Sequence, residues 1–383
     1  MAMHEIRFHA TIAELPAAAW DALRSNDNPF VSHAFLHALE SSGCIRPDWG
    51  WQAHHLGLYD GDLLVAAAPL YLKGNSHGEF VFDWSWASAW ERAGGQYYPK
   101  LLAGVPYSPV PGPRLLAGDS ERTSSLQREL VEAMQHEAAR LGLSSIHANF
   151  LPAQELAAFD QNWLTRSDVQ FHWHNHGYRD FADFLAALNH KKRKNIVHER
   201  RQVAASELTV EWRSGDNLSR AEWMRVHELY EATFDMKGNH AALTPAFFAG
   251  LGELGPTIQL ALARDGMIIV AMALFVQGGN VLYGRYWGAA LDVPGLHFEL
   301  CYYRGIEHAI AQGLERFEPG AQGEHKLARG FLPARTHSRH YLLNPDFRAA
   351  VANALSSEAA AVDAYAAELA EHSPYARREA TPR

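Results

Sequence analysis

Hydrophobic residues recur along the chain with two different periods, and together they predict helices alternating with strands. Residues 296–312 repeat apolar side chains at helical spacing on one stripe, which predicts an amphipathic helix. Residues 56–70 and 260–274 are instead apolar on both sides of an Asp-Gly pair. Because glycine accepts the positive φ of a tight turn, each of these two segments predicts a β-hairpin.

The same succession of elements occurs twice, which indicates an internal duplication. Ser32 and Thr244 each precede an apolar pattern and predict the capped start of a short helix. Each copy continues with a strand, a helix and a second strand: 80–87, 126–141 and 145–150, then 281–287, 296–312 and 316–318. Both helices end at a Gly-Leu pair, the expected stop signal. The fold class predicted is α/β, with two mixed sheets flanked by helices.

These patterns also predict the domain boundaries. We expect an N-terminal domain over 1–178 with a Pro-rich insert at 88–120, a basic linking helix over 179–206, a C-terminal domain over 207–370 and a flexible tail over 371–383. The insert is interpreted either as a surface flap over a site or as a structural arm that packs the two copies together. The residues alone leave both interpretations open.

Composition limits the class of protein. The 383 residues are 48% hydrophobic and 20% charged, which is typical of a soluble protein with two domains. The net charge of −9 argues against DNA as a partner, although it allows a local basic patch. The chain has two cysteines without redox or metal spacing, no signal-like start and no apolar run long enough to span a bilayer. We therefore expect a cytoplasmic protein.

Ionisable residues concentrate where two parallel strands of the second copy are predicted to end side by side, and ligands collect at such carboxyl ends. We expect catalytic side chains at Glu318, Glu324, His325 and Lys326. We expect substrate-binding side chains at Arg285, Tyr286, Trp287, His297, Glu299, Gln322 and Arg329. A solvated loop is the alternative for the run after Glu318.

Three further groups have functional interpretations. Asp83, Trp84 and Trp86 are expected to bind substrate in the first copy, although one tryptophan would serve equally well in the core. The basic residues Lys191, Lys192, Arg193, Lys194 and Arg200 are expected to bind donor phosphates, or else to form a solvated helix face. His172, His174 and His176 alternate along a strand, and we favour an edge-strand face over a metal site for them.

Several motifs resemble those of one bacterial family. They are Phe82-Asp-Trp-Ser-Trp-Ala, Tyr98-Pro-Lys-Leu-Leu, Leu282-Tyr-Gly-Arg-Tyr-Trp-Gly and Phe317-Glu-x-Gly-Ala-Gln-Gly-Glu-His-Lys-x-x-Arg-Gly-Phe331. They resemble the predicted N-acyltransferases of the GNAT superfamily, which are similar to Fem-type peptidoglycan peptidyltransferases. The resemblance covers about residues 25–370 and implies two tandem GNAT-like domains.

The resemblance also implies a reaction type. We expect transfer of an acyl or aminoacyl group to an amine acceptor, with Glu324 or His325 as base, Glu318 second, and Lys326 or Arg285 facing the oxyanion. Acyl-CoA and aminoacyl-tRNA both stay open as donor, since only Arg285–Ala290 matches a pyrophosphate loop. No tightly bound cofactor is expected. The alternative is a catalytically inactive module that binds a peptide or a cell-wall precursor.

Overall fold

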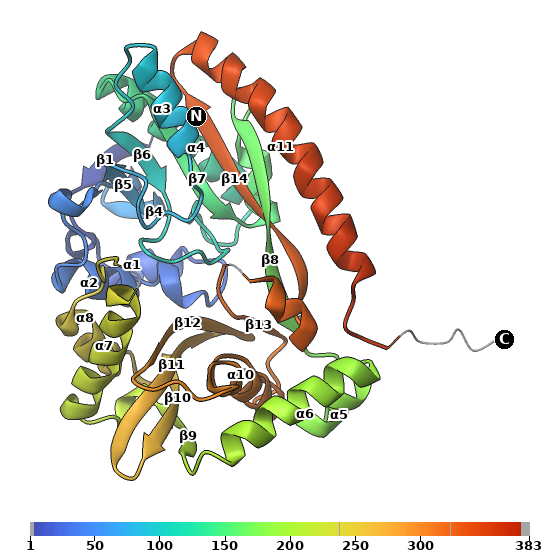
Figure 1. Cartoon of the computed structure of the whole chain (residues 1–383). Helices are drawn as coiled ribbons and strands as arrows, with labels where there is room; N and C mark the ends of the chain where they lie inside the picture. The colour runs from blue at the N-terminus through green and yellow to red at the C-terminus, as the bar shows by residue number, and fades with distance from the viewer. Residues whose placement is uncertain (1–3, 237, 322, 377–383) are drawn as a thin grey trace. The chain divides into compact units, whose positions relative to one another are not determined.

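The computed structural model describes residues 4–236, 238–321 and 323–376. The chain forms two compact units (Figure 1): unit 1 contains Met1–Asp168 and Arg335–Ala364, and unit 2 contains Val169–Ala334 and Tyr365–Arg383. This division differs from the expected domains, 1–178 and 207–370. The reason is that a strand and a helix late in the sequence pack largely with unit 1.

Unit 1 is built around two sheets. Its strands are β1 (Glu5–His9), β2 (Trp51–Ala53), β3 (His55–Asp60), β4 (Leu63–Ala68), β5 (Leu70–Lys73), β6 (Lys100–Ala103) and β7 (Ser145–Leu151). Its helices are α1 (Ala17–Ala22), α2 (His33–Ser41), α3 (Trp84–Arg92) and α4 (Thr123–Arg140). The strands β8 (Leu164–His174) and β14 (Leu332–Leu342) and the helix α11 (Pro345–Glu371) are shared between the units. One sheet has the order β1-β3-β4, and in the other β2, β5, β6, β7 and β14 are neighbours in that order.

The predicted hairpin and helices of the first copy are confirmed. β3 and β4 pair antiparallel around Gly61, whose φ of 60° is the left-handed conformation that the turn requires. Ser32 caps α2 by accepting a hydrogen bond from the backbone N–H of Phe35. The helix predicted over 126–141 is α4, and the strand that follows is β7.

The prediction of a strand over residues 80–87 is wrong. These residues form a loop and the start of α3, with Asp83 at the N-cap position. The strand that lies parallel to β7 is instead β6, which comes from the Pro-rich insert. Residues 100–117 of the insert are almost entirely buried, so the interpretation of this segment as a surface flap is also wrong.

Unit 2 contains one sheet in the order β8-β13-β12-β11-β10-β9. Its strands are β9 (Thr209–Ser214), β10 (Ile258–Asp265), β11 (Ile268–Gly278), β12 (Val281–Ala289) and β13 (Arg316–Glu318), besides the end of β8. Its helices are α5 (Phe181–Ala187), α6 (His190–Ala204), α7 (Arg220–Asp235), α8 (Pro245–Leu251), α9 (Leu296–Phe298) and α10 (Arg304–Ala311). A π-helical stretch, η7 (Glu299–Tyr303), joins α9 to α10, and a 3-10 turn, η8 (Glu324–Arg329), follows β13.

Helices cover both faces of this sheet. Alternate residues of β10 and β11, such as Ala261 and Ala273, share a core with α5, α6 and α10. α7 packs against β11 and β12 from the other face. The approach is close, because a Cβ on Gly288 would lie 2.1 Å from the backbone oxygen of Leu229. Only glycine is compatible with that contact.

Two predictions about the ends of elements need correction. The single helix expected over 179–206 is divided into α5 and α6, because the side chain of Asn189 accepts a hydrogen bond from the N–H of Lys192 and caps a new helix. The tail expected to be flexible from 371 is bound as far as 376. The N–H of Ala376 donates to the carbonyl of Ala187 over 3.0 Å. Residues 377–383 lie outside the described part of the chain.

Candidate active site

The parallel strands β12 and β13 separate in unit 2 where the sequence predicts the site. Their register ends at Tyr283 opposite Glu318, after which β12 continues alone. Arg285 is an extra residue on β12, since Phe275 pairs with Gly284 and Leu274 pairs with Tyr286. Such a β-bulge interrupts strand pairing and re-aims the side chain of the extra residue. The separation therefore creates space, and the bulge places Arg285 at its edge.

A cavity of about 170 Å³ occupies this separation. Its lining comes from β11, β12, the helical segment α9–η7 and the turn after β13: Ala273, Leu274, Phe275, Gly284, Arg285, Tyr286, Trp287, His297, Cys301, Tyr302 and Pro319. Four of the predicted binding residues, Arg285, Tyr286, Trp287 and His297, are thus brought together. A cavity of this size is smaller than a typical pocket for a complete drug-sized ligand. It suits a short acyl or aminoacyl group.

Tyr302 connects the cavity to His325. Tyr302, which η7 presents to the cavity, was not among the predicted site residues, although π-helical stretches are frequent at functional sites. Its hydroxyl lies 2.8 Å from Nε2 of His325. Burial, together with the charges of Arg329 and Lys326, lowers the pKa of His325. The neutral imidazole is therefore able to accept a hydrogen bond from the Tyr302 hydroxyl, and burial raises the pKa of that hydroxyl.

Glu318 is buried beside the cavity at the end of β13. Burial raises the pKa of its carboxyl to about 7, while Arg316 and Arg285 act in the opposite direction. Arg316 donates through Nε to Oε1 over 2.8 Å. The imidazole of His172 lies 3.8 Å from the other carboxylate oxygen, and burial lowers its pKa to about 3. His172, interpreted from sequence as part of an edge-strand face in preference to a metal site, is thus a neutral neighbour of Glu318.

Lys326 lies below the surface and holds the turn after β13. Its ammonium group donates to the carbonyl oxygen of Gly320 over 2.8 Å, and the residue is only 2% exposed. Burial lowers its pKa to about 8. Lys326 is not among the residues that line the cavity.

Two of the expected binding residues have partners within the protein instead. The carboxylate of Glu299 accepts two hydrogen bonds of 3.0 Å from Arg200, and Arg304 lies 3.1 Å away. Arg200 also donates to Glu307 over 2.6 Å. These contacts engage both Glu299, expected to bind substrate, and Arg200, expected to bind phosphate. Neither belongs to the lining of the cavity.

Arg329 and Glu324 also have internal partners. Arg329 donates to Glu199 over 2.6 Å and stacks on the ring of Phe298 at 3.3 Å. Glu324 is exposed and accepts a hydrogen bond of 2.7 Å from the hydroxyl of Tyr365. Gln322 lies outside the described residues. The predicted cluster after Glu318 is therefore only partly directed at the cavity.

The C-terminal segment, residues 365–376, bonds to both ends of η8. Tyr365 bonds to Glu324 at its start, and the hydroxyl of Tyr375 donates to the carbonyl of Gly330 over 2.7 Å at its end. The residue Gly330 has a φ of 95° and admits no larger side chain, since a Cβ would lie 2.7 Å from the ring of Phe184. The turn that carries His325 and Lys326 is thus held from two sides.

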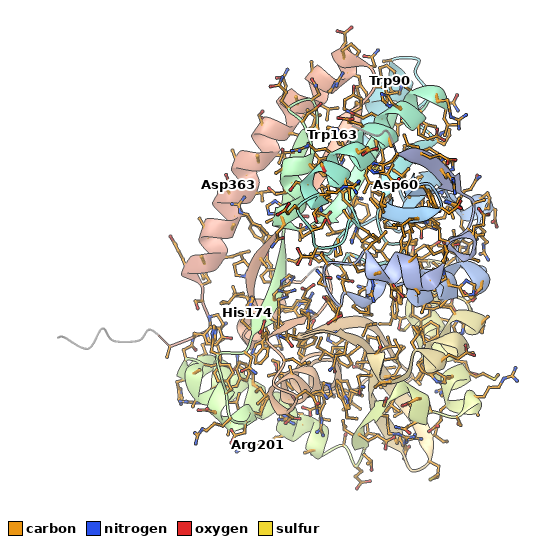
Figure 2. All side chains as sticks on the ribbon, turned by 180° about the vertical axis from the view of Figure 1, so that it is seen from behind. Asp60, Trp90, Trp163, His174, Arg201 and Asp363 are labelled. Carbon is orange, nitrogen blue, oxygen red and sulfur yellow. The ribbon has the colours of Figure 1, made fainter. Side chains whose placement is uncertain are left out.

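Four of the five expected phosphate-binding residues gather at the start of α6, whereas the fifth, Arg200, bonds to Glu299 and Glu307. Lys191, Lys192, Arg193 and Lys194 occupy the first turns of α6, where they are exposed or half-buried. Arg201 lies near the other end of this helix, and Figure 2 labels it together with His174 at the end of β8. The match at Arg285–Ala290 does not form a phosphate loop, because it lies almost entirely within β12.

Unit 1 contains a second ionisable cluster at its own parallel pair, β6 and β7. Lys100 is fully buried and donates over 2.9 Å to Glu79 and over 2.5 Å to Asp83. The hydroxyl of Tyr97 donates to Asp83 over 2.7 Å, and the ring of His147 lies 3.6 Å from the same oxygen. Asp83 was expected to bind substrate, whereas here it is 1% exposed and neutralises a buried lysine.

The two tryptophans next to Asp83 differ. Trp86 is buried with its ring against His340 at 5.1 Å, so the core alternative is correct for it. Trp84 is 48% exposed. Sequence reasoning did not select Lys100, Glu79 or His340. A usable signal was the lysine bordering the apolar Leu101–Ala103 strand, because a lysine there needs a buried counter-ion.

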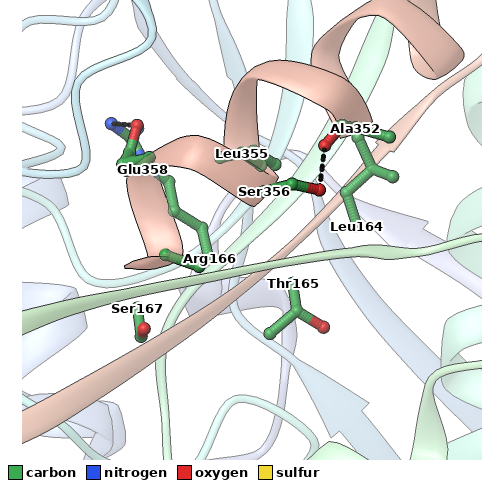
Figure 3. Close-up of a pocket in the computed structure, with 9 residues that line it drawn as sticks. Leu164, Thr165, Arg166, Ser167, Ala352, Leu355, Ser356 and Glu358 are labelled. Carbon is green, nitrogen blue, oxygen red and sulfur yellow. Dashed lines mark hydrogen bonds and ion pairs between the residues drawn. The ribbon is translucent and has the colours of Figure 1, made fainter. Parts of the chain in front are cut away.

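A shallow groove of about 270 Å³ in unit 1 runs between the start of β8 and α11 (Figure 3). Arg166 crosses it and donates to Glu358 over 2.5 and 3.1 Å. The hydroxyl of Ser356 donates to the carbonyl of Ala352 over 3.1 Å within α11. Because these polar groups satisfy one another, the groove offers little chemistry of its own.

Comparison with known proteins decides the family. The sequence model of the FemAB-like family matches residues 11–377, and that family is described as one of peptidoglycan biosynthesis or recognition. The chain belongs to the FemAB-like family. No curated protein matches it.

Solved structures show that this FemAB-like chain shares its fold with FemX. FemX superposes with a TM-score of 0.52 at 12% identity, covering 91% of this chain and 100% of FemX. The C-terminal domain of a lysylphosphatidylglycerol synthetase candidate from Agrobacterium fabrum superposes with a TM-score of 0.53 at 13% identity. The match covers 90% of this chain and 96% of that domain. At such identities the likeness establishes the fold alone.

No helix in the described ranges is both long and apolar enough to cross a membrane. Within the same ranges, no group of three or more His, Cys, Asp and Glu side chains is arranged to hold a metal ion.

Proposed function

We propose that this FemAB-like protein is an N-acyltransferase that transfers an acyl or aminoacyl group to an amine of a peptidoglycan-precursor peptide. The observation that carries the proposal is the cavity between β12 and β13, with the bulged Arg285, Tyr302 and His297 on its wall. The family description supports the acceptor class. The size of the cavity supports a short transferred group.

Arg285 stabilises the developing negative charge in this proposal. Attack of an amine on the acyl carbonyl gives a tetrahedral oxyanion, and a fixed cation in a poorly hydrated site stabilises it. The Arg285 side chain lines the cavity, and the buried Glu318 lies within its electrostatic reach. Glu318 is a positioning residue here, because it is not itself part of the cavity wall.

Tyr302 and His325 remove the proton from the attacking amine. The Tyr302 hydroxyl lines the cavity and bonds to His325, which is exposed at the other end. The amine gives its proton to the Tyr302 oxygen as that hydroxyl gives its own proton to Nε2 of His325. Solvent then takes the proton from the imidazole, and the leaving group departs as the tetrahedral intermediate collapses. General base catalysis of this kind contributes about 10²- to 10⁴-fold.

The basic start of α6 binds the donor phosphates in this proposal. Lys191, Lys192, Arg193 and Lys194 crowd the helix N-terminus, where the helix dipole disfavours cations and attracts anions. The other half of α6 touches α9, since a Cβ on Gly295 would lie 2.8 Å from the backbone oxygen of Glu199. At 1.5 Å per residue, Lys192 lies about 10 Å along the helix from that contact. Acyl-CoA and aminoacyl-tRNA both offer such phosphates.

The proposal is tested by measuring transfer from labelled acyl-CoA and from aminoacyl-tRNA to a peptide amine, followed by mass spectrometry of the product. Tyr302→Phe and His325→Ala are each expected to lower kcat by about 10²-fold or more. His372→Ala is the matched control, because His372 is exposed at the end of α11 and bonds only to the backbone of its own helix. Ligand binding without transfer by the wild type would establish the binding module instead.

A further inference from the structure

Glu199 of α6 shares a closed set of hydrogen bonds with two residues of unit 2 that border the candidate site. Its carboxylate accepts a hydrogen bond from the hydroxyl of Tyr303, the last residue of η7. It accepts another, of 2.6 Å, from the guanidinium of Arg329, the last residue of η8. Nε of Arg329 donates to the same Tyr303 hydroxyl over 3.1 Å. We call Glu199, Tyr303 and Arg329 the α6 triad, because each residue contacts the other two.

The α6 triad reaches both members of the pair that the proposed mechanism uses. Tyr303 directly follows Tyr302 in the π-helical stretch and is fully buried. Arg329 donates through a terminal nitrogen to the backbone carbonyl of His325 over 2.8 Å. Hydrogen bonds between ionised groups are the strong ones, and they fix geometry as well as adding energy. One carboxylate of α6 therefore ties together the two segments that carry the Tyr302 hydroxyl and the His325 imidazole.

The charged and titratable groups close to the imidazole of His325 come from three elements. The Tyr302 hydroxyl of η7 lies 2.8 Å from Nε2, and the ring of His297 of α9 lies 6.3 Å away between centroids. Lys326 and Arg329 belong to the same turn, η8. Burial, followed by the charges of Arg329 and Lys326, lowers the pKa of His325. The surroundings of this imidazole thus disfavour its protonated form.

Glu199 limits this effect, because its carboxylate is paired with Arg329. A cation next to an imidazole makes protonation harder, and a carboxylate bonded to that cation offsets part of its field. The side chains of Arg329 and Glu199 are only 10% and 19% exposed, so solvent screens the pair poorly. Loss of the carboxylate would leave the guanidinium unopposed beside the turn that carries His325.

We propose that Glu199 is a positioning residue for the proton acceptor of the transfer step. Through Tyr303 and Arg329 it holds the His325 imidazole against the hydroxyl of Tyr302, and it neutralises the cation beside that imidazole. The inference rests on the proposed function, because it deepens the role given there to Tyr302 and His325. It adds that α6, whose first turns are proposed to bind donor phosphates, also carries the residue that aligns the proton acceptor.

Two variants separate alignment from charge. Glu199→Gln keeps hydrogen-bonding atoms in place but removes the negative charge, so protonation of His325 becomes harder. The acidic limb of the kcat profile should then move to lower pH by about 0.5 unit, because a base must be deprotonated to act. Glu199→Ala also removes the bonds and should lower kcat by about tenfold or more, with little change in KM, since small misplacements of reacting groups are costly. Glu199→Gln should recover much of that loss.

Glu307→Gln is the matched control. Glu307 of α10 accepts a hydrogen bond of 2.6 Å from Arg200, the neighbour of Glu199 on α6, and one of 3.2 Å from Arg304. Its side chain is 29% exposed, close to the 19% of Glu199. The variant therefore removes a similar carboxylate from the same helix and should leave the pH profile unchanged. NMR titration of histidine-labelled protein, with the His325 signal assigned from His325→Asn, measures the same shift without turnover.

An unmoved His325 titration in Glu199→Gln would overturn the inference, and so would an equal shift in Glu307→Gln. A folded Glu199→Ala protein with the wild-type kcat would overturn it as well. The two proposals fail separately. Wild-type protein that transfers nothing, with the expected shift in Glu199→Gln, would refute the proposed function and keep Glu199 as the residue that controls His325. Normal transfer with an unmoved titration would refute the inference alone.

Discussion

Each unit places ionisable residues at a parallel strand pair, at the start of β6 in unit 1 and at the end of β13 in unit 2, and the two units use them differently. In unit 1, at β6 and β7, Lys100 is closed in by Glu79 and Asp83, and all three are at most 4% exposed. In unit 2, at β12 and β13, the charges surround a cavity, and Arg285 is on its wall. The difference teaches that a duplicated strand pair can either compensate its charges internally or direct them at a ligand.

The largest expected effect is the loss of Lys100. Lys100→Met leaves two buried carboxylates without their cation and should lower the free energy of unfolding by about 3–5 kcal/mol. Lys326→Met removes a lysine whose ammonium group bonds to the carbonyl of Gly320 and to no buried carboxylate among the described residues, and should cost much less. Urea unfolding of both variants measures the difference. Equal losses of unfolding free energy in the two variants would contradict the view that only the unit 1 cluster neutralises its charges internally.

Glu318 in unit 2 and Asp83 in unit 1 should respond to pH with opposite sign. The pKa of Glu318 is about 7 in the folded protein, and its ordinary value is 4.5. Its contribution to the free energy of unfolding is therefore full below pH 4.5 and is lost as the pH rises through 7. Glu318→Gln should therefore stabilise the protein at pH 8, by about 3 kcal/mol, and change little at pH 4.

Asp83 provides the opposite case. Lys100 holds the pKa of Asp83 below its ordinary value of 3.8 against the effect of burial, so its stabilising contribution is present above 3.8 and lost as pH falls. Asp83→Asn should destabilise the protein at pH 8. Unfolding free energies at pH 4 and pH 8 check both variants, and the same sign for both would contradict the comparison.

The sequence predicted those features of the two regions that depend on residues close together along the chain. The hairpins, the caps at Ser32 and Thr244 and the parallel pair at β12 are local or periodic signals, and the structure confirms them. The strand over 80–87 was wrong because Asp83 is fixed by Lys100, a contact across the Pro-rich insert. A pattern read along one segment contains no information about such a partner.

The site shows the same limit. Adjacent residues of one strand, Arg285 to Trp287, were correctly placed together, as was His297 at the start of the following helix. Glu299 and Arg329 were predicted to face the same cavity, but Arg200 and Glu199, both on α6, engage them. Tyr302 was missed because its position depends on the π-helical stretch, which shifts the face of the helix that meets the cavity.

The salt dependence of donor binding sharpens the account of unit 2. Replacing Lys191 and Lys194, the two more exposed residues of the basic turn, by Ala should weaken donor binding and reduce its dependence on salt. The unfolding curve should change little, because exposed charges contribute little to stability. Titration of donor at two salt concentrations measures this. An unchanged salt dependence would assign the donor phosphates to another surface.

The smallest expected effect concerns the C-terminal segment. Tyr375→Phe removes the hydrogen bond to Gly330 and should cost about 1 kcal/mol, with faster hydrogen exchange in residues 323–331. Tyr365→Phe, which frees the exposed Glu324, should have a weaker effect. Exchange measured by mass spectrometry reports the turn directly. Unchanged exchange in Tyr375→Phe would show that the segment does not hold η8.

The most direct test of the transferase account is the rate of acyl transfer by Arg285→Ala compared with Arg179→Ala, a variant of an arginine that is 83% exposed and does not line the cavity. Loss of the group that faces the oxyanion should lower kcat by about 10²- to 10³-fold, while the control variant keeps the wild-type rate. Equal rates in a folded Arg285→Ala protein would show that the cavity between β12 and β13 is not where transfer occurs.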